Sequence, residues 1–230
     1  MNIKILEFID GARNATGLTV VIDVFRAFSV SCYAFNQGAS RIIVTNSVDE
    51  AFRLKSLYND ALLSGERDER KIPGFDFGNS PTEIVLNDLS GKTIIQTTTA
   101  GTNGLLNAVN ADILLAGSFV NAEAIAKYIK KINPKTVSLV AMGYRANQTA
   151  DEDILCAQYI VDRIKGGRKD FSNKIQQLRK TSGKRFFAPE NLEFSPPSDF
   201  FYCTMTDKFD FILKAEKRDD GNIELIKTEI

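Results

Sequence analysis

The chain has 230 residues, 43% of them hydrophobic and 25% charged, which is enough apolar material for one large domain with a buried core and excludes a disordered chain. Lys plus Arg and Asp plus Glu both total 29, so no overall electric field favours nucleic acid or a membrane surface, and we expect a small molecule as the partner. The absence of histidine excludes a Ser-His-Asp triad, a phosphohistidine intermediate and any histidine-ligated metal centre.

Short runs rich in β-branched residues alternate along the chain with amphipathic stretches of helical length. Strands are predicted near residues 3–8, 18–22, 41–45, 61–64, 92–98, 112–116 and 136–141. Helices are predicted over 26–37, 48–59, a short stretch from Pro81, 102–109, 119–132 and 151–165. The order Ser80-Pro81-Thr82-Glu83 is that of a capping box and marks a helix start. Together these patterns predict an α/β fold with three layers, α/β/α, around a largely parallel or mixed central sheet.

The regular pattern weakens after Gly167, at the start of a C-terminal subregion that covers about 168–230. Its basic segment, 169–185, is interpreted as the solvated charged face of an appended helical part rather than as a binding arm. The further elements predicted here are a helix over 198–206 and a terminal β-hairpin of 209–217 and 222–227. We therefore predict a single domain over 1–230 with a C-terminal helical and hairpin extension.

Two features bear on the location of the protein. The first ten residues place charges among the apolar ones, unlike a signal peptide, and no later apolar run is long enough to cross a bilayer. Cys32, Cys156 and Cys203 are widely separated, which fits reduced thiols better than disulfides or a zinc site. We expect a cytoplasmic protein that binds neither nucleic acid nor membrane, and the sequence leaves a homo-oligomer open.

Unusual polar residues follow four of the predicted strands. In open parallel α/β sheets, ligands bind beyond the carboxyl ends of the strands. The residues at these ends are Asp23 with Arg26, Gly65-Glu66-Arg67, Thr97-Thr98-Thr99 and Gly143-Tyr144-Arg145. We expect the four strands to bring carboxylates, arginines and hydroxyl groups together at one rim of the sheet.

Asp23 can be interpreted in two ways. A carboxylate directly after an apolar strand is a candidate magnesium ligand or nucleophile. The alternative is a helix cap for the segment that starts near Arg26. We favour the functional interpretation, because Arg26 would otherwise lack an obvious partner.

Glu66 is either an exposed turn charge or a functional carboxylate. The segment 74–81, Gly-Phe-Asp-Phe-Gly-Asn-Ser-Pro, favours function, because small and polar residues broken by glycines leave backbone N–H groups free to hold an anion. Glu66 and Asp76 are together candidates for holding a hard cation.

The run Thr-Thr-Thr-Ala-Gly-Thr at 97–102 is either an edge strand rich in β-branched residues or a phosphate-binding turn. We favour the second, because a strand, a glycine turn and a helix N-terminus in this order aim backbone N–H groups at phosphate oxygens. Asp151, Glu152 and Asp153 begin a helix, where acidic residues suit the helix dipole without any further role. Of these three, only Asp153 is predicted to bind metal.

Several motifs occur in an order that resembles a known enzyme family over about residues 17–165. They are Val21-Ile22-Asp23-Val24-Phe25-Arg26-Ala27, Gly65-Glu66-Arg67, Gly74-Phe75-Asp76-Phe77-Gly78-Asn79-Ser80-Pro81, Gly91-Lys92-Thr93 before Thr97-Thr98-Thr99, Gly117-Ser118-Phe119, and Glu152-Asp153 before Cys156-Ala157. The chain resembles the 2-phosphosulfolactate phosphatase family, magnesium-dependent enzymes known from coenzyme M biosynthesis. The resemblance implies a Mg²⁺-dependent phosphomonoesterase for a small phosphorylated 2-hydroxy acid, which converts 2-phosphosulfolactate to sulfolactate and phosphate.

In the picture that this resemblance implies, Asp23, Arg26 and Glu66 are catalytic, and Asp23, Glu66 and Asp153 hold Mg²⁺. The expected substrate-binding residues are Arg67, Asn79, Ser80, Thr97, Thr98, Thr99, Gly101, Thr102 and Arg145. Either metal-activated water or the Asp23 carboxylate attacks phosphorus, and the sequence does not choose between these nucleophiles.

Two positions depart from the family's usual Thr-Thr-Thr-Asn-Gly-Thr-Arg. This chain has Ala100 and Asn103 there, which removes an amide and a cation from the predicted phosphate loop. These departures motivate a second hypothesis, a catalytically weak binding protein that keeps the fold and binds a small phosphorylated or sulfonated acid.

Overall fold

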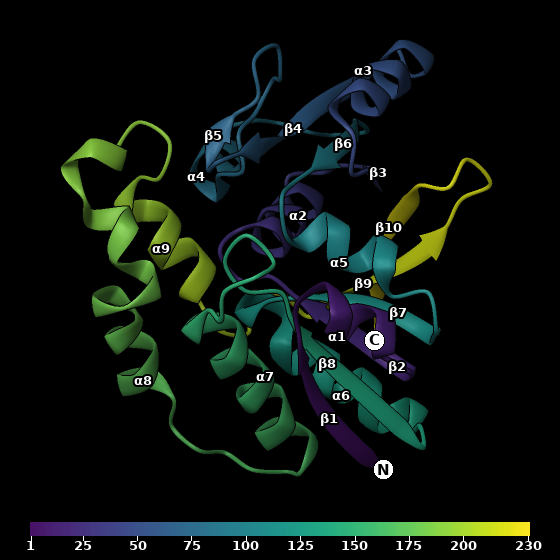
Figure 1. Cartoon of the computed structure of the whole chain (residues 1–230), viewed down its shortest axis with the longest axis vertical. Helices are drawn as coiled ribbons and strands as arrows, with labels where there is room; N and C mark the ends of the chain where they lie inside the picture. Colours follow the sequence, from purple (N-terminus) through teal and green to yellow (C-terminus); the bar gives the residue numbers. More distant parts are fainter.

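One mixed sheet runs through the whole protein in the computed structural model, which describes residues 1–230 (Figure 1). Its strand order is β1-β8-β2-β7-β9-β10-β3-β6-β4-β5. The strands are β1 (Asn2–Glu7), β2 (Gly17–Ile22), β3 (Arg41–Val44), β4 (Ala61–Arg67), β5 (Arg70–Lys71), β6 (Thr93–Thr97), β7 (Ala111–Gly117), β8 (Thr136–Ala141), β9 (Phe211–Lys217) and β10 (Ile223–Glu229). All the predicted strands form, and β4 continues past the expected end through Glu66 into a hairpin with β5.

The sheet contains two parallel groups of strands that run in opposite directions. β1, β8, β2 and β7 are parallel neighbours, and so are β3, β6 and β4. The hairpin of β9 and β10 lies between the groups and is antiparallel to both β7 and β3. This arrangement confirms the predicted fold class with a mixed sheet. The predicted terminal hairpin forms, and it lies in the middle of the sheet rather than at its edge.

Helices cover both faces of the sheet, as the three-layer prediction requires (Figure 1). Val21 and Ile22 of β2 illustrate the alternation, because Val21 packs into the core on one face and Ile22 into the core on the other. The helices on the Val21 face are α1 (Phe8–Asn14), α2 (Ala27–Asn36), α4 (Pro81–Val85) and α5 (Gly101–Asn107). The helices on the other face are α3 (Val48–Leu57), α6 (Ala122–Ile132) and α7 (Asp151–Ile164).

The sequence predicted the start of α4 but missed α1, and local features of the chain explain both outcomes. α4 begins as predicted, with the Ser80 hydroxyl accepting the N–H of Glu83 at 3.4 Å. The Glu83 carboxylate accepts the N–H of Gly78 at 2.7 Å rather than that of Ser80, so only half of the capping box forms. α1 was not predicted, because it is short and contains Gly11, where a Cβ atom would lie 3.0 Å from the Cβ of Leu6.

After α7 the chain forms short helical segments that lie along one side of the molecule (Figure 1). They are α8 (Ser172–Gln177), the 3₁₀ turns η2 (Leu178–Lys180), η3 (Ser182–Phe187) and η4 (Pro189–Asn191), and α9 (Pro197–Thr204); a further 3₁₀ turn, η1 (Phe119–Asn121), precedes α6. Phe186 and Phe200 from these segments are buried in the same core as α6 and α7. No helix in the structure has the length and apolar content that crossing a membrane requires.

Candidate active site

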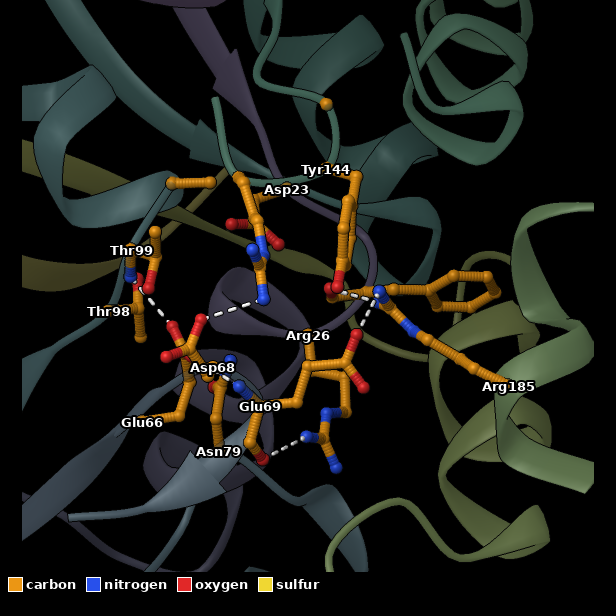
Figure 2. A pocket seen from close by; sticks show the side chains of 14 residues that line it. Asp23, Arg26, Glu66, Asp68, Glu69, Asn79, Thr98, Thr99, Tyr144 and Arg185 are labelled. Atoms are coloured by element: carbon orange, nitrogen blue, oxygen red, sulfur yellow. Dashed lines mark hydrogen bonds and ion pairs between the residues drawn. The ribbon is translucent and has the colours of Figure 1, made fainter. Parts of the chain in front are cut away.

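A narrow pocket lies where the carboxyl ends of β2, β4, β6 and β8 meet, with a volume of about 40 Å³ (Figure 2). It is lined by Asp23, Phe25, Arg26, Glu66, Asp68, Glu69, Asn79, Thr98, Thr99, Ala100, Gly143, Tyr144, Arg145 and Arg185. The expectation that these four strand ends share one site is therefore confirmed.

The reason for this convergence differs from the one that the sequence suggested. The two parallel groups run in opposite directions, so in a flat sheet their carboxyl ends would lie at opposite edges. Neighbouring strands rotate by roughly 20°, so five strand-to-strand steps from β2 to β6 turn one group by roughly 100° relative to the other. We attribute the meeting of the two sets of ends to this twist.

Asp23 is buried immediately after β2 and is held by backbone N–H groups. Its Oδ1 accepts the N–H of Ala27, the first residue of α2, at 3.1 Å. Burial raises the pKa of Asp23 to about 6, the hydrogen bond from Ala27 opposes this, and the charge of Glu66 adds to it. Asp23 therefore contacts the first turn of α2, as the helix-cap alternative expects, and it also lines the pocket, as the functional interpretation expects.

Glu66 connects two loops of the pocket. Its Oε1 accepts the N–H of Thr99 at 2.7 Å, and its Oε2 accepts the N–H of Glu69 at 2.9 Å. The side chain is buried, so Glu66 is not an exposed turn charge. Asp76 does not join it, because its Oδ2 accepts hydrogen bonds from Lys55 at 2.6 Å and from the Leu63 N–H at 2.8 Å, away from the pocket lining.

The threonine turn after β6 satisfies much of its own hydrogen bonding. The N–H of Thr98 donates to Thr102 Oγ1 at 3.0 Å, and the N–H of Thr102 donates to Thr98 Oγ1 at 3.3 Å. Thr98, Thr99 and Ala100 line the pocket, whereas Thr97, Gly101 and Thr102 lie behind it. The predicted cradle of free N–H groups is therefore partly used by acceptors of the protein itself.

Arg26 lines the pocket and has a buried partner that the sequence did not reveal. Its Nη1 donates to Asp199 Oδ2 at 2.6 Å and to the carbonyl of Phe194 at 2.7 Å, and its Nη2 donates to the carbonyl of Glu69 at 3.3 Å. The argument that Arg26 lacks a partner other than Asp23 was therefore wrong, because Asp199 of α9 lies 173 residues away along the chain.

The other two predicted arginines differ in position. Arg145 lines the pocket and pairs with Asp68 at 2.7 Å. Arg67 lies outside the pocket lining, where it donates to the Glu66 carbonyl and to Thr97 Oγ1 at 2.7 and 3.0 Å. Arg145 is thus placed to meet a ligand, whereas Arg67 braces the end of β4 against β6.

Asn79 and Ser80 also occupy different environments. Asn79 lines the pocket, and its buried Oδ1 has no hydrogen-bond partner in the protein. Ser80 lies behind the pocket and donates from Oγ to Asp199 Oδ1 at 2.8 Å. Asn79 therefore offers a free oxygen to the site, whereas Ser80 supports the partner of Arg26.

Asp153 lies next to the pocket but does not line it. Its Oδ1 accepts the N–H of Val24 and its Oδ2 the N–H of Gly143, both at 2.8 Å. These bonds join the loops that follow β2 and β8. No three Asp, Glu, His or Cys side chains are grouped as the ligands of one metal ion, so the expected set of Asp23, Glu66 and Asp153 is not assembled in this structure.

Arg185 and Glu69 are pocket residues that the sequence did not indicate. Arg185 donates from Nη1 to Glu69 Oε1 and from Nη2 to the carbonyl of Phe25, both at 2.9 Å (Figure 2). Its guanidinium lies 5.2 Å from the centre of the Tyr144 ring. Most of the basic segment 169–185 is exposed as predicted, but its last residue enters the site. Its position at the end of a charged run gave no sign of this.

The comparisons with known proteins identify the family. Residues 4–218 match the family model described as 2-phosphosulpholactate phosphatase. The chain belongs to this family. A probable 2-phosphosulfolactate phosphatase of Bacillus subtilis (strain 168) is 35% identical over 217 residues, which are 93% of this chain and 92% of the relative.

Two further relatives bear the same name. The protein of Carboxydothermus hydrogenoformans (strain ATCC BAA-161 / DSM 6008 / Z-2901) is 42% identical over 170 residues, 74% of this chain and 70% of its own. The protein of Clostridium perfringens (strain SM101 / Type A) is 31% identical over 242 residues, 97% of this chain and 95% of its own. These matches confirm the resemblance seen in the sequence motifs and make the chain a phosphoric monoester hydrolase by family.

Proposed function

We propose that this protein hydrolyses a small phosphorylated 2-hydroxy acid with the help of Mg²⁺, at the pocket that contains Asp23 and Glu66. The family and the names of the relatives support phosphomonoester hydrolysis and make 2-phosphosulfolactate the first candidate substrate. The observation that carries the proposal is the convergence of two buried carboxylates, three arginines and an unpartnered amide oxygen in one pocket of about 40 Å³.

The charges of the pocket support a divalent cation. Its lining contains the four carboxylates of Asp23, Glu66, Asp68 and Glu69 and the three guanidinium groups of Arg26, Arg145 and Arg185. This balance alone repels a doubly charged phosphate ester. Mg²⁺ would reverse it, and when bound it supplies positive charge that stabilises the transferring phosphoryl group.

The residues of the pocket fit such a cation. Mg²⁺ prefers carboxylate and carbonyl oxygens, and Asp23, Glu66 and the unpartnered Oδ1 of Asn79 are of this type. Each carboxylate oxygen retains lone-pair capacity after accepting one backbone N–H. We propose these three residues as the ones that would hold the ion. Asp153 would instead position Asp23, since it fixes the neighbouring Val24 N–H.

Two roles of Asp23 are compatible with this environment. The carboxylate either attacks phosphorus directly, which breaks the ester bond and forms an acyl phosphate, or accepts a proton from the attacking water. Arg145, which is half exposed and linked only to Asp68 by an ion pair, is free to contact the phosphoryl group. Hydroxylamine trapping during a single turnover separates the two roles, because only direct attack forms an acyl phosphate on Asp23, which hydroxylamine converts to a hydroxamate with release of phosphate.

The main test measures phosphate release from 2-phosphosulfolactate and from a panel of phosphorylated 2-hydroxy acids, with Mg²⁺ and with a chelator. We expect release that requires Mg²⁺ and falls by at least about 100-fold in Asp23→Asn and in Glu66→Gln. Asp60→Asn, at an exposed position, is the matched control and should retain activity. Absence of metal-dependent release from every ester would refute the reaction, whereas full activity of the double variant Asp23→Asn with Glu66→Gln would refute only the site.

Ala100 favours a second candidate, a catalytically weak binding protein for a phosphorylated or sulfonated acid. It lines the pocket at a position where the family usually has asparagine, and Asn103 donates to the Thr99 carbonyl at 3.0 Å instead of supplying a cation. This candidate predicts ligand binding without turnover in the wild type. It also predicts a gain of phosphate release in the double variant Ala100→Asn with Asn103→Arg.

A further inference from the structure

Asp199 is a buried carboxylate outside the pocket lining that bonds to two segments of the chain beside the pocket. It lies on α9, in the C-terminal subregion, and is fully buried. Its Oδ2 accepts a hydrogen bond from Arg26 Nη1 at 2.6 Å. Its Oδ1 accepts the Ser80 hydroxyl at 2.8 Å, and the N–H and the hydroxyl of Thr82 at 3.0 and 2.6 Å. One side chain thus joins the loop after β2 to the start of α4.

Both segments carry residues that line the pocket. Arg26 itself lines it, and so does Asn79, which directly precedes Ser80 (Figure 2). Two backbone carbonyls hold the Arg26 guanidinium as well, since that of Phe194 accepts Nη1 at 2.7 Å and that of Glu69 accepts Nη2 at 3.3 Å. The guanidinium is therefore fixed largely from the C-terminal subregion, which supplies two of its three acceptors.

Stability alone does not account for the ion pair of Arg26 and Asp199. The two side chains are only 3% and 0% exposed. Taking two charges out of water is costly, and replacing a buried ion pair by apolar residues of similar volume is often neutral or stabilising. A buried pair does, however, hold a guanidinium in one place. A site that must meet a charged group in a defined geometry requires this.

We propose that Asp199 is a positioning residue, which holds the Arg26 guanidinium in the orientation in which Arg26 contacts the phosphoryl group. The proposal rests on the proposed phosphatase function and gives the C-terminal subregion a part in catalysis. Asp199 itself does not contact the substrate. Its negative charge weakens the attraction of Arg26 for an anion, so its contribution is to the geometry of the transition state rather than to substrate binding.

The test measures kcat for phosphate release and the inhibition constant of inorganic phosphate in Asp199→Asn. We expect kcat to fall by at least about tenfold, because Arg26 is no longer held in place. The inhibition constant should stay within about threefold of the wild-type value or fall, since removing a negative charge favours anion binding. Circular dichroism at the assay temperature establishes that the variant is folded.

Asp162→Asn is the matched control. Asp162 also pairs with an arginine, Arg163, at 2.6 Å, and the two side chains are 9% and 10% exposed, but both lie outside the pocket lining. The control should lower the melting temperature and keep the wild-type kcat. Equal losses of kcat in the two folded variants overturn the proposal, and so does a wild-type kcat in Asp199→Asn.

Thr82→Val carries the test if Asp199→Asn does not fold. It removes one hydroxyl group from Oδ1 of Asp199 and leaves the charge of Arg26 paired. We expect kcat to fall several-fold, because Asp199 is then less firmly fixed. An unchanged kcat in this variant overturns the positioning role.

NMR of the arginine side chains separates this proposal from the proposed reaction. The ¹⁵Nε–H signal of Arg26, identified by its absence in Arg26→Lys, should shift when Mg²⁺ and inorganic phosphate are added to the wild type. The shift should be smaller, and the signal broader, in Asp199→Asn. That result supports the positioning role even if no ester is hydrolysed, a finding that would end the phosphatase proposal alone. No shift in the wild type, or the same shift in both proteins, overturns the positioning role.

Discussion

At the scale of single residues, the carboxylates of the site are positioned by backbone N–H groups rather than by charged side chains. The carboxylate of Asp23 accepts the N–H of Ala27, and that of Glu66 accepts the N–H groups of Thr99 and Glu69. The carboxylate of Asp153 accepts the N–H groups of Val24 and Gly143. Backbone groups have little freedom to move, so this arrangement fixes the carboxylate oxygens closely. Small changes in the backbone near Asp23 should therefore affect function strongly.

Gly101 tests this dependence. A Cβ atom there would lie 2.7 Å from Oδ2 of Asp23 and 2.9 Å from the Cβ of Ala27, so Gly101→Ala must displace Asp23 or the turn. We expect kcat for phosphate release to fall by about 100-fold, the effect of misplacing a reacting group by roughly 1 Å. Gly78→Ala is the control, since a Cβ atom there would lie 3.4 Å from its nearest neighbour, Oε1 of Glu83, an ordinary contact. A wild-type kcat in Gly101→Ala would show that catalysis does not depend on the exact position of the Asp23 carboxylate.

The buried pair of Arg26 and Asp199 makes a prediction about stability. Asp199 is fully buried and also accepts hydrogen bonds from Ser80 and Thr82, so Asp199→Ala leaves the Arg26 charge without a partner in the interior. We expect the free energy of unfolding to fall by about 3–5 kcal/mol. Urea denaturation measures this, with the exposed Asp60→Ala as a control that should change stability by less than about 0.5 kcal/mol. A loss as small as that of the control would mean that the pair is solvated.

These residues also show what the sequence can and cannot reveal about a site. Asp23 and Glu66 could be predicted, because a carboxylate near the end of an apolar strand is a local signal. The contacts of Arg26 with Asp199 and of Arg185 with Glu69 join positions 173 and 116 residues apart. Such contacts depend on tertiary packing, which no local pattern contains.

At the scale of elements, the segment between β4 and α4 is attached to the sheet by Asp76. Its Oδ2 binds Lys55 of α3 and the Leu63 N–H of β4. Burial raises the pKa of Asp76, but the hydrogen bonds from Lys55 and Leu63 outweigh it, so the pKa lies below its usual value of 3.8. The ionised form therefore stabilises the folded state.

The sign of this shift gives a pH-dependent prediction. A carboxylate with a lowered pKa stabilises the fold fully above its unfolded pKa and loses that contribution as the pH falls through its folded pKa. We expect Asp76→Asn to be less stable than the wild type by about 1 kcal/mol at pH 7, with the difference shrinking below about pH 4. Chemical denaturation at pH 7, 5 and 3.5 measures it. A difference that stays constant with pH, or grows in acid, contradicts the assignment.

At the scale of the whole molecule, the C-terminal hairpin joins the two parallel groups of the sheet. β9 pairs with β7 on one side, and β10 pairs with β3 on the other. The sequence predicted the strands of both groups and the hairpin itself, because alternation and turn residues are local signals. The opposite directions of the groups follow only from where the hairpin inserts, which is a long-range pairing. The site depends on this pairing, since its residues come from both groups.

Leu213 measures how much the fold depends on the inserted hairpin. It lies on β9 opposite Ala116 of β7 and is fully buried in the core that contains α2 and α5. If the hairpin is integral to the sheet, Leu213→Ala opens a cavity in the centre of the protein and lowers the free energy of unfolding by about 2–5 kcal/mol.

Ile5→Ala is the control on the edge strand β1, where the side chain is 42% exposed, and it should lower the free energy of unfolding by less than about 1 kcal/mol. Because the chain contains no tryptophan, urea unfolding is followed by circular dichroism, which gives the free energy of unfolding of both variants. Equal small losses in the two variants would mean that the two parallel groups hold together without the hairpin, and the position of Asp23 relative to Glu66 would then need another explanation.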